Sequence, residues 1–413
     1  MVKFLRTPLR IKKCLLLVVL TVLLFSRTAY GLPPFQLFVE ITPEGGTLRP
    51  IAGNYAGPVM INKRITIEGG GHVTIDGNGD GTVLSVLAEG VVVRGLNLIN
   101  SGQSHDKVDA GILVAADNVL IEDNTISNTL FGVHIKQAND TIIRNNRITS
   151  IDEQESSLRG DGLRMWYSEG NLIEGNEFVA VRDLLFSNSS DNRIIGNTIK
   201  NSRMGMELVF SSDNKIEDNL IEKNIKGIAL IYSHGVEIRH NKIAHLRDIT
   251  GSAISIKGSS KAVIINNKIQ NCAIGFVANA PIHPEHIFNL QDNQFSYNDV
   301  AMYFYGEKGG HRINGNRFEN NMTDVVVSGS SSAFDNDWHG NYWDRYEGFD
   351  QDGDGYGDRP YNIYIYSDRL WMDRPMTKFF RGSPSLEVLD IVERLAPFSE
   401  PILILTDSKP KIK

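Results

Sequence analysis

The stretch Ile121–Ile126, IEDNTI, contains a short pattern that returns along most of this chain of 413 residues. It recurs 22 residues later as IRNNRI, Ile143–Ile148. The Asn within it recurs at spacings of 21 to 30 residues, at Asn124, Asn146, Asn176, Asn197, Asn219, Asn241, Asn267, Asn293 and Asn316. A period of this length indicates stacked repeats, because one unit is too short to bury its own apolar side chains.

Other residue types recur in step with this Asn. Isoleucine stands three residues before it and serine eight residues before it in five consecutive units, as Ile173, Ile194, Ile216, Ile238, Ile264, Ser168, Ser189, Ser211, Ser233 and Ser259. Apolar pairs two residues apart precede the serines, as Leu163/Met165, Leu184/Phe186, Met206/Leu208, Ile228/Leu230 and Ile254/Ile256. A period of two is typical of strands with one buried side. We therefore predict an all-β fold, a right-handed parallel β-helix of about ten coils.

The Asn and Ser columns have a structural explanation. Asn tolerates the left-handed backbone region that a corner often needs. Stacked amides also hydrogen-bond along a column, as they do in other β ladders. We expect both columns to stabilise the coil and to carry no chemistry.

Residues 1–31 have the pattern of a secretory signal peptide. Five basic residues up to Lys13 precede the apolar run Cys14–Phe25, and small residues follow at Ala29 and Gly31. The run is short for a membrane span, although an uncleaved anchor is the alternative. Removal of six basic residues changes the formal charge from −7 to −13, which does not suit nucleic-acid binding. Only Cys272 then remains, so no intrachain disulfide forms.

The rest of the chain divides into two predicted parts. Residues 32–334 form the β-helix, with a lead-in strand at Phe38–Ile41 and insertions at residues 100–110 and 150–161 that become loops on one face. Residues 335–413 form a cap, rich in aromatic residues, over the open end of the coil. Its aromatic residues are Trp338, Tyr342, Trp343, Tyr346, Phe349, Tyr356 and Tyr361. A short amphipathic helix is expected over residues 383–396.

Within the cap, carboxylates alternate in the loop DQDGDGYGD. Asp350, Asp352, Asp354 and Asp358 match positions one, three, five and nine of a calcium-binding loop, with Gly355 at position six. The twelfth position is Tyr361 where such loops have a Glu. The loop thus predicts a calcium site, and a metal-free Asp/Gly turn is the alternative.

The outward side of the strands that carry the apolar pairs is the candidate working face. We predict that it docks a partner through Arg164, Trp166, Leu185, Glu207, Val209 and Ile231. Apolar residues on a surface that should be polar indicate an interaction site. Cover by a segment of the chain itself, such as the C-terminal tail, is the alternative.

Soft-metal ligands are sparse. Met165 and Met206 fall in inward columns and, with Met204, are expected in the core. His234, His240 and His245 occupy different corner positions, so a shared metal site is only weakly indicated.

Several ordered motifs together resemble the NosD family of periplasmic β-helix proteins, from about residue 38 to the C-terminus. They are Asp109–Ile112, Gly160–Ser168, Gly340–Trp343, the acidic loop, Asp368–Trp371, Ser383–Pro384 and Pro397–Phe398. The resemblance implies a non-enzymatic accessory protein for the copper centre of nitrous oxide reductase. It implies as partners an ABC transporter ATPase and permease (NosF and NosY) and a copper-chaperone lipoprotein (NosL).

One departure from the family bears on copper. Family coils commonly carry His and Met in the outward columns, where this chain has Glu207 and Val209. Direct copper binding on that face is therefore not predicted by the residues, and a paralogue that serves another transporter or cargo is a second interpretation.

Two other function classes stay open. A polysaccharide lyase or epimerase would need a base and a charge-neutralising cation over a groove, from Arg164, Arg182, Asp183 and Glu207. Asp161 and Arg182, however, fall in one column, where a ladder ion pair is the simpler interpretation. The third class is a glycan-binding solenoid without chemistry.

Overall fold

The computed structural model describes residues 31–152, 155–279, 287–306, 309–328, 333–365, 388, 391–392 and 401–412. Residues from Pro34 onward form one compact unit. The predicted signal peptide lies outside the described residues except for Gly31. Among the described helices, none has the length and apolar character that a membrane span requires.

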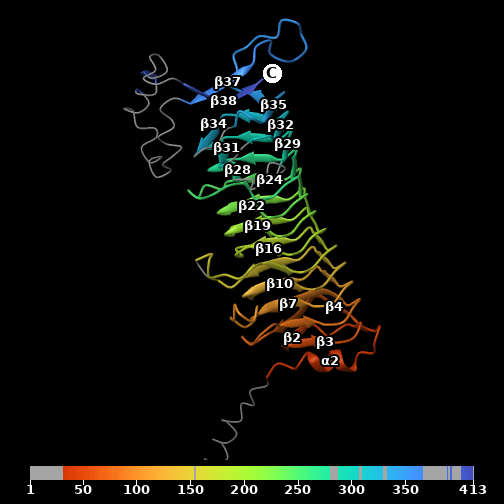
Figure 1. Ribbon diagram of the computed structural model, residues 1–413. Helices are drawn as coiled ribbons and strands as arrows, with labels where there is room; N and C mark the ends of the chain where they lie inside the picture. The colour runs from red at the N-terminus through yellow and green to blue at the C-terminus, as the bar shows by residue number, and fades with distance from the viewer. Residues whose placement is uncertain are drawn as a thin grey trace, which may run out of the picture. The chain divides into compact units, whose positions relative to one another are not determined.

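Nearly all described elements of this unit are strands that stack as the rungs of a parallel β-helix (Figure 1). The coils contribute one strand each to a 12-stranded sheet, and most of them contribute two strands to a 24-stranded sheet. The 12-stranded sheet consists of β3 (Val59–Ile61), β5 (Leu84–Val86), β7 (Ala110–Val114), β10 (Phe131–Lys136), β13 (Leu163–Trp166), β16 (Leu184–Ser187), β19 (Met204–Val209), β22 (Lys226–Ile231), β25 (Ile254–Lys257), β28 (Ile274–Asn279), β31 (Val300–Tyr305) and β34 (Thr323–Ser328). The fold class predicted from the repeats is confirmed.

The 24-stranded sheet runs around a corner, so that most coils add two short strands to it. Before the corner lie β1 (Thr47–Leu48), β8 (Leu120–Glu122), β11 (Ile142–Arg144), β14 (Leu172–Glu174), β17 (Arg193–Ile195), β20 (Lys215–Glu217), β23 (Glu237–Arg239), β26 (Val263–Ile265), β29 (Asn289–Gln291), β32 (Arg312–Asn314) and β35 (Asp337–His339). After it lie β2 (Gly53–Ala56), β9 (Thr125–Thr129), β12 (Arg147–Ser150), β15 (Glu177–Val179), β18 (Thr198–Lys200), β21 (Leu220–Glu222), β24 (Lys242–Ala244), β27 (Lys268–Gln270), β30 (Gln294–Ser296), β33 (Arg317–Glu319) and β36 (Tyr342–Trp343). Only β4 (Thr66–Asp76) and β6 (Val92–Ile99) pass through the corner unbroken.

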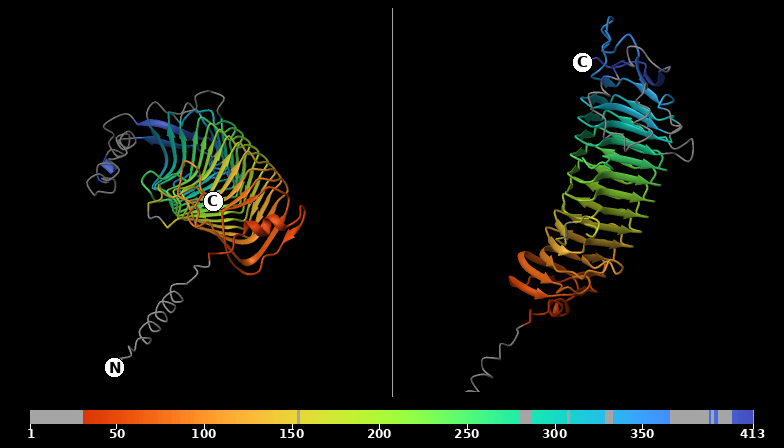
Figure 2. Two further views of the ribbon diagram at one scale, coloured as in Figure 1. Left: turned by 90° about the horizontal axis from the view of Figure 1, so that it is seen from below. Right: turned by 90° about the vertical axis from the view of Figure 1, so that its left-hand side faces the viewer.

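The stack has about twelve coils, against the ten expected. The expected number of coils was too low because the first coils lack the repeated Asn. Their corner is made by Gly69–Gly71 in β4 and by Gly95 in β6, where a Cβ on Gly69 would lie 2.4 Å from the carbonyl oxygen of Gly95. Backbone therefore lies against backbone at a corner where later coils place an amide. Figure 2 shows how the coils from these first ones onward stack on one another.

Successive coils lie in register, so equivalent side chains fall in columns. Ile143, for example, pairs with Ile121 on one side and with Ile173 on the other. The predicted inward pairs of β13, β16, β19, β22 and β25 are all buried, with at most 4% of any side chain exposed. Their burial at roughly 25 cal/mol per Å² of apolar surface is the main stabilising contribution.

The predicted Asn column is a continuous ladder of buried amides. From Asn124 to Asn341 each side-chain Nδ2 donates to the Oδ1 of the next column member at 2.9–3.1 Å. The left-handed residue, however, is the one before the column Asn, such as Asn145 (φ 54°) before Asn146. The expectation that the column Asn itself takes this conformation was wrong, because its amide must point inward to continue the ladder.

The Ser column is also a ladder. The backbone N–H of each Ser donates to the hydroxyl of the next, from Ser168 to Ser259, at 2.9–3.2 Å. A second amide column, absent from the sequence interpretation, runs through Asn171, Asn192 and Asn214. Most corners of the middle coils are thus closed by buried side-chain hydrogen bonds.

The N-terminal end differs from the expectation of a strand. Gln36–Ile41 forms the helix α2, with Val39 buried and Leu37 and Ile41 exposed. A short apolar run does not distinguish a strand from a helix by periodicity, and here packing decides. Phe35 at its start is fully buried and meets the ring of Tyr55 edge to face at 5.4 Å.

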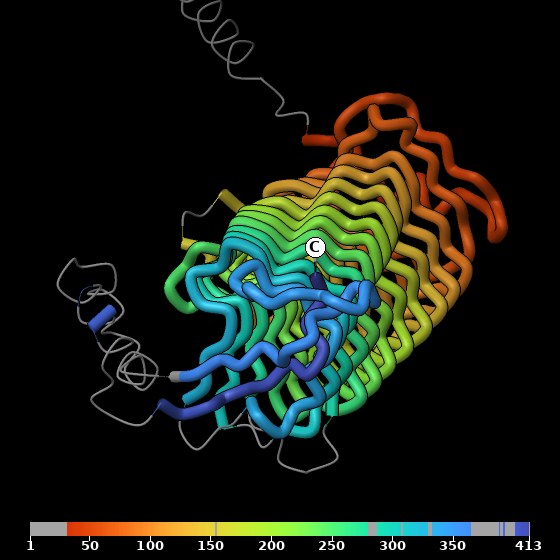
Figure 3. Tube along the Cα trace, turned by 90° about the horizontal axis from the view of Figure 1, so that it is seen from above, coloured from red at the N-terminus to blue at the C-terminus, as the bar shows by residue number. Residues whose placement is uncertain are grey.

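Aromatic residues close the C-terminal end, as predicted. The ring of Trp343 stacks on that of Phe318 at 4.2 Å. The antiparallel pair β37 (Tyr361–Ile365) and β38 (Ile402–Asp407) follows, and Figure 3 shows these blue segments lying over the end of the coils. Parallel pairing itself continues as far as β36. The expected helix over 383–396 lies outside the described residues, apart from Val388, Ile391 and Val392, which are helical.

Candidate functional site

The predicted docking residues lie on the outer side of the 12-stranded sheet, between β13 and β22. Strand pairing resolves them into two columns that run across the strands. One column contains His134, Arg164, Leu185, Glu207, Ala229 and Ser255. The other contains Lys136, Trp166, Ser187, Val209, Ile231 and Lys257.

Exposure on this face is uneven. Trp166 is 40% exposed, whereas Leu185, Val209 and Ile231 are half-buried by their neighbours. Leu185 lies in the Arg164 column, and Ser187 separates Trp166 from Val209 in the other. The apolar stripe is therefore staggered over two columns, as the alternation of side chains along the strands predicts.

Buried carboxylates hold arginines along one edge of this face. Asp161 is fully buried and accepts from Arg164 at 3.0 Å and from Arg182 at 2.8 Å. Asp183, also buried, pairs with Arg203, whose Nε donates to it at 3.0 Å. The predicted ladder pair of Asp161 and Arg182 is confirmed, and Arg203 is the partner that the sequence interpretation missed.

The same edge contains a ring that the two insertions cover. Phe131, at the start of β10, is 1% exposed and forms a buried cluster with Ala110 and Leu130. Val108 and Ile151, one from each insertion, pack against this cluster. The guanidinium carbons of Arg164 and Arg182 lie 5.9 and 5.8 Å from its ring centre. These arginines are thus fixed by an aromatic ring as well as by Asp161.

Two titratable groups on the face are shifted by their surroundings. Burial raises the pKa of Glu207, Asp183 raises it further, and Arg203 opposes the change. Burial, together with the charges of Arg164 and Lys136, lowers the pKa of His134 to about 4. His134 is therefore neutral at physiological pH.

The donor set of this face does not fit copper. The thioethers of Met165 and Met206 point into the core and are fully buried, and Met204 is 7% exposed, as predicted. His234 bonds to Ser260 at 2.7 Å, while His240 and His245 lie at other corners. Within the described part of the chain, no His or Cys belongs to a cluster of three or more His, Cys, Asp or Glu side chains whose ligand atoms converge.

The acidic loop brings three of its four carboxylates together. One oxygen each from Asp350, Asp352 and Asp354 lies within 4.8 Å of the others, the only such group in the described part of the chain. Asp350 also accepts the backbone N–H groups of Gly353 at 2.7 Å and Gly355 at 2.9 Å, which fixes the turn. Carboxylate oxygens in this arrangement suit a hard cation such as calcium. Asp358 is not in the group.

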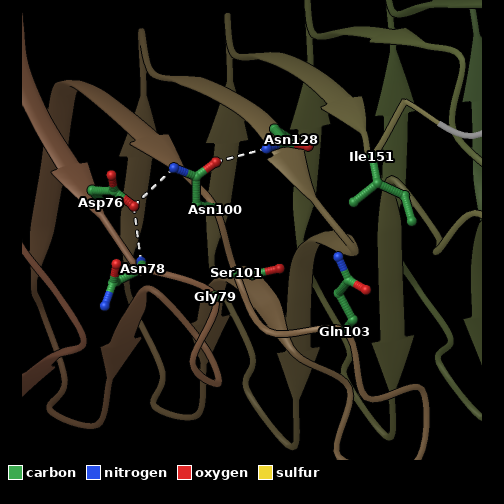
Figure 4. A pocket seen from close by; sticks show the side chains of 8 residues that line it. All are labelled: Asp76, Asn78, Gly79, Asn100, Ser101, Gln103, Asn128 and Ile151. Carbon is green, nitrogen blue, oxygen red and sulfur yellow. Dashed lines mark hydrogen bonds between the residues drawn. The ribbon is translucent and has the colours of Figure 1, made fainter.

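A polar pocket of about 280 Å³ lies near the first insertion (Figure 4). The carboxylate of Asp76 accepts from the side chain of Asn100 at 2.9 Å, and Asn100 accepts from Asn128 at 2.6 Å. Ser101, Gln103, Ile151, Asn78 and Gly79 complete the lining. Because its polar groups already bond to one another, the pocket is not the strongest candidate for function.

Comparison with known proteins identifies relatives of the whole chain. The profile of a family described as "Periplasmic copper-binding protein (NosD)" matches residues 148–348. "Probable ABC transporter binding protein NosD" of Pseudomonas aeruginosa is 30% identical over 383 residues, which cover 87% of this chain and 89% of the relative. The protein of the same name from Stutzerimonas stutzeri is 27% identical over 405 residues, 91% of this chain and 89% of the relative.

Solved structures resemble the fold only. The A-module of Azotobacter vinelandii mannuronan C-5 epimerase AlgE4 superposes with a TM-score of 0.53 at 14% identity, covering 75% of this chain and 98% of the module. The catalytic domain of a GH87 α-1,3-glucanase gives 0.57 at 14%, covering 75% and 68%. The Streptococcus pneumoniae adhesin PfbA gives 0.52 at 12%, covering 71% and 94%.

Together, the stacked coils define a parallel β-helix protein. The chain belongs to the NosD family, as the relative that is 30% identical over most of both chains shows.

Proposed function

We propose that this chain is an exported accessory protein that docks on an ABC transporter and assists assembly of the copper centre of nitrous oxide reductase. The observation that carries the proposal is the staggered apolar surface of Trp166, Leu185, Val209 and Ile231 on one face of a rigid coil. Exposed apolar surface of this kind marks interaction sites. The names of the relatives supply the class of partner, an ABC transporter.

The chain acts here as a scaffold and not as an enzyme. Arg164 and Arg182 are engaged by Asp161, and Asp183 is engaged by Arg203, so these charges hold one another in place. A lyase or epimerase would need them directed at substrate. Residues 1–31 serve as the export signal, in keeping with the family's periplasmic description.

Co-purification tests the docking step. The full chain is co-expressed with the ATPase and permease of a NosF/NosY type, extracted in detergent and separated by size exclusion. We expect one ternary peak. Separate elution of the chain and the transporter contradicts the proposal.

The copper role has its own measurement. Nitrous oxide reductase is produced with and without this chain, in the presence of a NosL-type lipoprotein, and its copper content is measured by mass spectrometry. We expect less copper per reductase when the chain is absent. Equal copper content would favour the alternative of a paralogue with another cargo.

A further inference from the structure

Large aromatic residues occupy strained backbone positions beside the docking face. In the 12-stranded sheet, each strand from β10 to β25 is followed directly by a residue in the left-handed region. The residues and their φ angles are Gln137 (50°), Tyr167 (49°), Asn188 (49°), Phe210 (50°), Tyr232 (50°) and Gly258 (60°). Gly and Asn adopt this conformation readily, whereas for bulky side chains it is a genuine outlier. Three of these six positions nevertheless hold aromatic rings.

These rings gain little from burial in return. Tyr167 is 52% exposed and Phe210 is 56% exposed. Phe210 stacks on Tyr232 at 5.3 Å with the planes 11° apart, and Tyr232 covers Gly258, where an added Cβ would lie 2.5 Å from the tyrosine ring. Strain without compensating burial is typical of a functional surface.

The two outward columns between β10 and β25 form a strip on the 12-stranded sheet. Charged residues lie near both ends of this strip and in its middle. Lys136 and Lys257 are exposed and flank Trp166, Val209 and Ile231 in one column, which continues past Lys257 to Asn279. Glu207 lies half-buried between them, next to Leu185. None of these three charges is in an ion pair with another residue that the structure describes.

The register fixes how far apart these charges are. Five rungs separate Lys136 from Lys257, and three separate Lys136 from Glu207. At the usual strand spacing the two lysines are roughly 24 Å apart, and Glu207, in the neighbouring column, is offset from Lys136 by roughly 14 Å along the stack. Contact with a partner would bury Glu207 further, which is costly unless the partner supplies a cation.

We propose that the strip from Lys136 to Lys257, with its ledge of Tyr167, Phe210 and Tyr232, is the surface that one segment of the transporter contacts. That segment presents apolar side chains, a carboxylate near each end and a cation between them. The inference rests on the proposed function and specifies the partner of the same face. Complementary charges set the register of the contact, and the aromatic ledge supplies its apolar area.

Charge reversal tests the electrostatic part. The ATPase–permease complex in nanodiscs is the probe, and binding of the full chain is followed by biolayer interferometry at two salt concentrations. We expect the Lys136→Glu/Lys257→Glu variant to bind at least tenfold more weakly, mostly through a slower association rate. The control is Lys242→Glu/Lys268→Glu, two exposed lysines in register on β24 and β27, which should bind as wild type.

Phe210→Asn separates a binding role from a structural one. Asn stands at the equivalent position of the preceding coil, Asn188, with almost the same φ. The substitution relieves strain, so we expect an unchanged or higher melting temperature together with at least tenfold weaker binding. A lower melting temperature with unchanged affinity would show that the ring serves the fold and would overturn the inference.

The two proposals fail in different ways. If wild-type chain does not bind the transporter, the proposed function is wrong and this inference falls with it. If wild type binds and both strip variants bind equally well, the chain docks through another surface and only this inference is wrong.

Discussion

At the scale of single residues, neighbouring asparagines have different tasks. Asn266 is exposed and takes the left-handed conformation that turns the corner (φ 56°). Asn267 is fully buried, and its Nδ2 donates to Ile238 O at 2.8 Å and to Asn293 Oδ1 at 2.9 Å. Its own Oδ1 accepts from Asn241. The first residue supplies a backbone shape, and the second supplies hydrogen bonds between three coils.

Substitution of these two residues should therefore have opposite outcomes. Asn267→Ala leaves the buried backbone N–H of Asn241 without its acceptor and removes a donor to the carbonyl of Ile238, so the free energy of unfolding should fall by about 3 kcal/mol. Asn266→Gly keeps the corner conformation and should be nearly neutral. Urea denaturation of both variants measures the difference. Equal losses would mean that the ladder contributes no more than the turn.

Asp324, at the start of β34, gives the protein a predicted pH dependence. It is buried beside Asn321, Arg345, Asp344 and Tyr361, and burial raises its pKa to about 6. In the unfolded chain the pKa is about 3.9. The folded state therefore binds this proton more tightly, and its contribution to stability is lost as the pH rises from about 4 through about 6.

Asp324→Asn should remove that dependence. At roughly 1.4 kcal/mol per pKa unit, the gain above pH 7 is on the order of 3 kcal/mol at most. Thermal melts at pH 4.5 and pH 7.5 measure it, with the exposed Asp123→Asn as the control that keeps the wild-type profile. If the melting temperature of the variant still decreased from pH 4.5 to pH 7.5 as in wild type, the pH dependence would come from another group.

At the scale of elements, the last strand continues the amide ladder into the cap. Asp407 of β38 is fully buried, and its Oδ2 accepts from the backbone N–H of Asn341 at 3.1 Å, from its side chain at 3.0 Å and from Trp343 Nε1 at 3.0 Å. A carboxylate here accepts hydrogen bonds from N–H groups that would otherwise need an acceptor in a following coil. The ladder thus ends on a side chain 66 residues further along the sequence.

The acidic loop of the cap is predicted to bind calcium. Titration of the full chain with Ca²⁺ by calorimetry should give one site, and Asp352→Asn should weaken it at least tenfold by removing one of the three converging carboxylates. Glu347→Gln, just before the loop, serves as the control that binds normally. Absence of any binding heat in wild type would favour the metal-free turn.

At the scale of the whole described coil, the two open ends are the vulnerable places. A parallel β-helix leaves strand edges and core side chains uncovered at each end, and such edges promote association. α2 covers the first coil with Phe35 and Val39, and β37 with β38 follows the last. These two elements are the covers of the open ends among the described residues.

Opening the first end should cause association. Val39→Asp places a charge against the core at a position that is 2% exposed, so α2 should detach and the chain should self-associate. Leu37→Asp on the same helix, at a position 56% exposed, should leave the protein unchanged. Light scattering after size exclusion distinguishes the two. A monomeric Val39→Asp variant would mean that α2 is not the cover.

The sequence determined the coil, because its columns are local repeats. Asn219 and Asn241 are separated by one period, so stacking them requires no knowledge of distant contacts, and the same holds for the serines and inward isoleucines. The docking columns were also readable, since side chains alternate along a strand. The acidic loop was readable as a motif, although not which of its carboxylates converge.

Tertiary structure decided what lies outside the repeat. Periodicity could not choose between strand and helix for Gln36–Ile41, because burial of one side chain, Val39, settles it. Nor could it show that Asp407 ends the ladder, or that residues of the two insertions pack against the cluster of Phe131. Each of these depends on residues brought together by the winding of the chain, and a repeat specifies contacts only between neighbours one period apart.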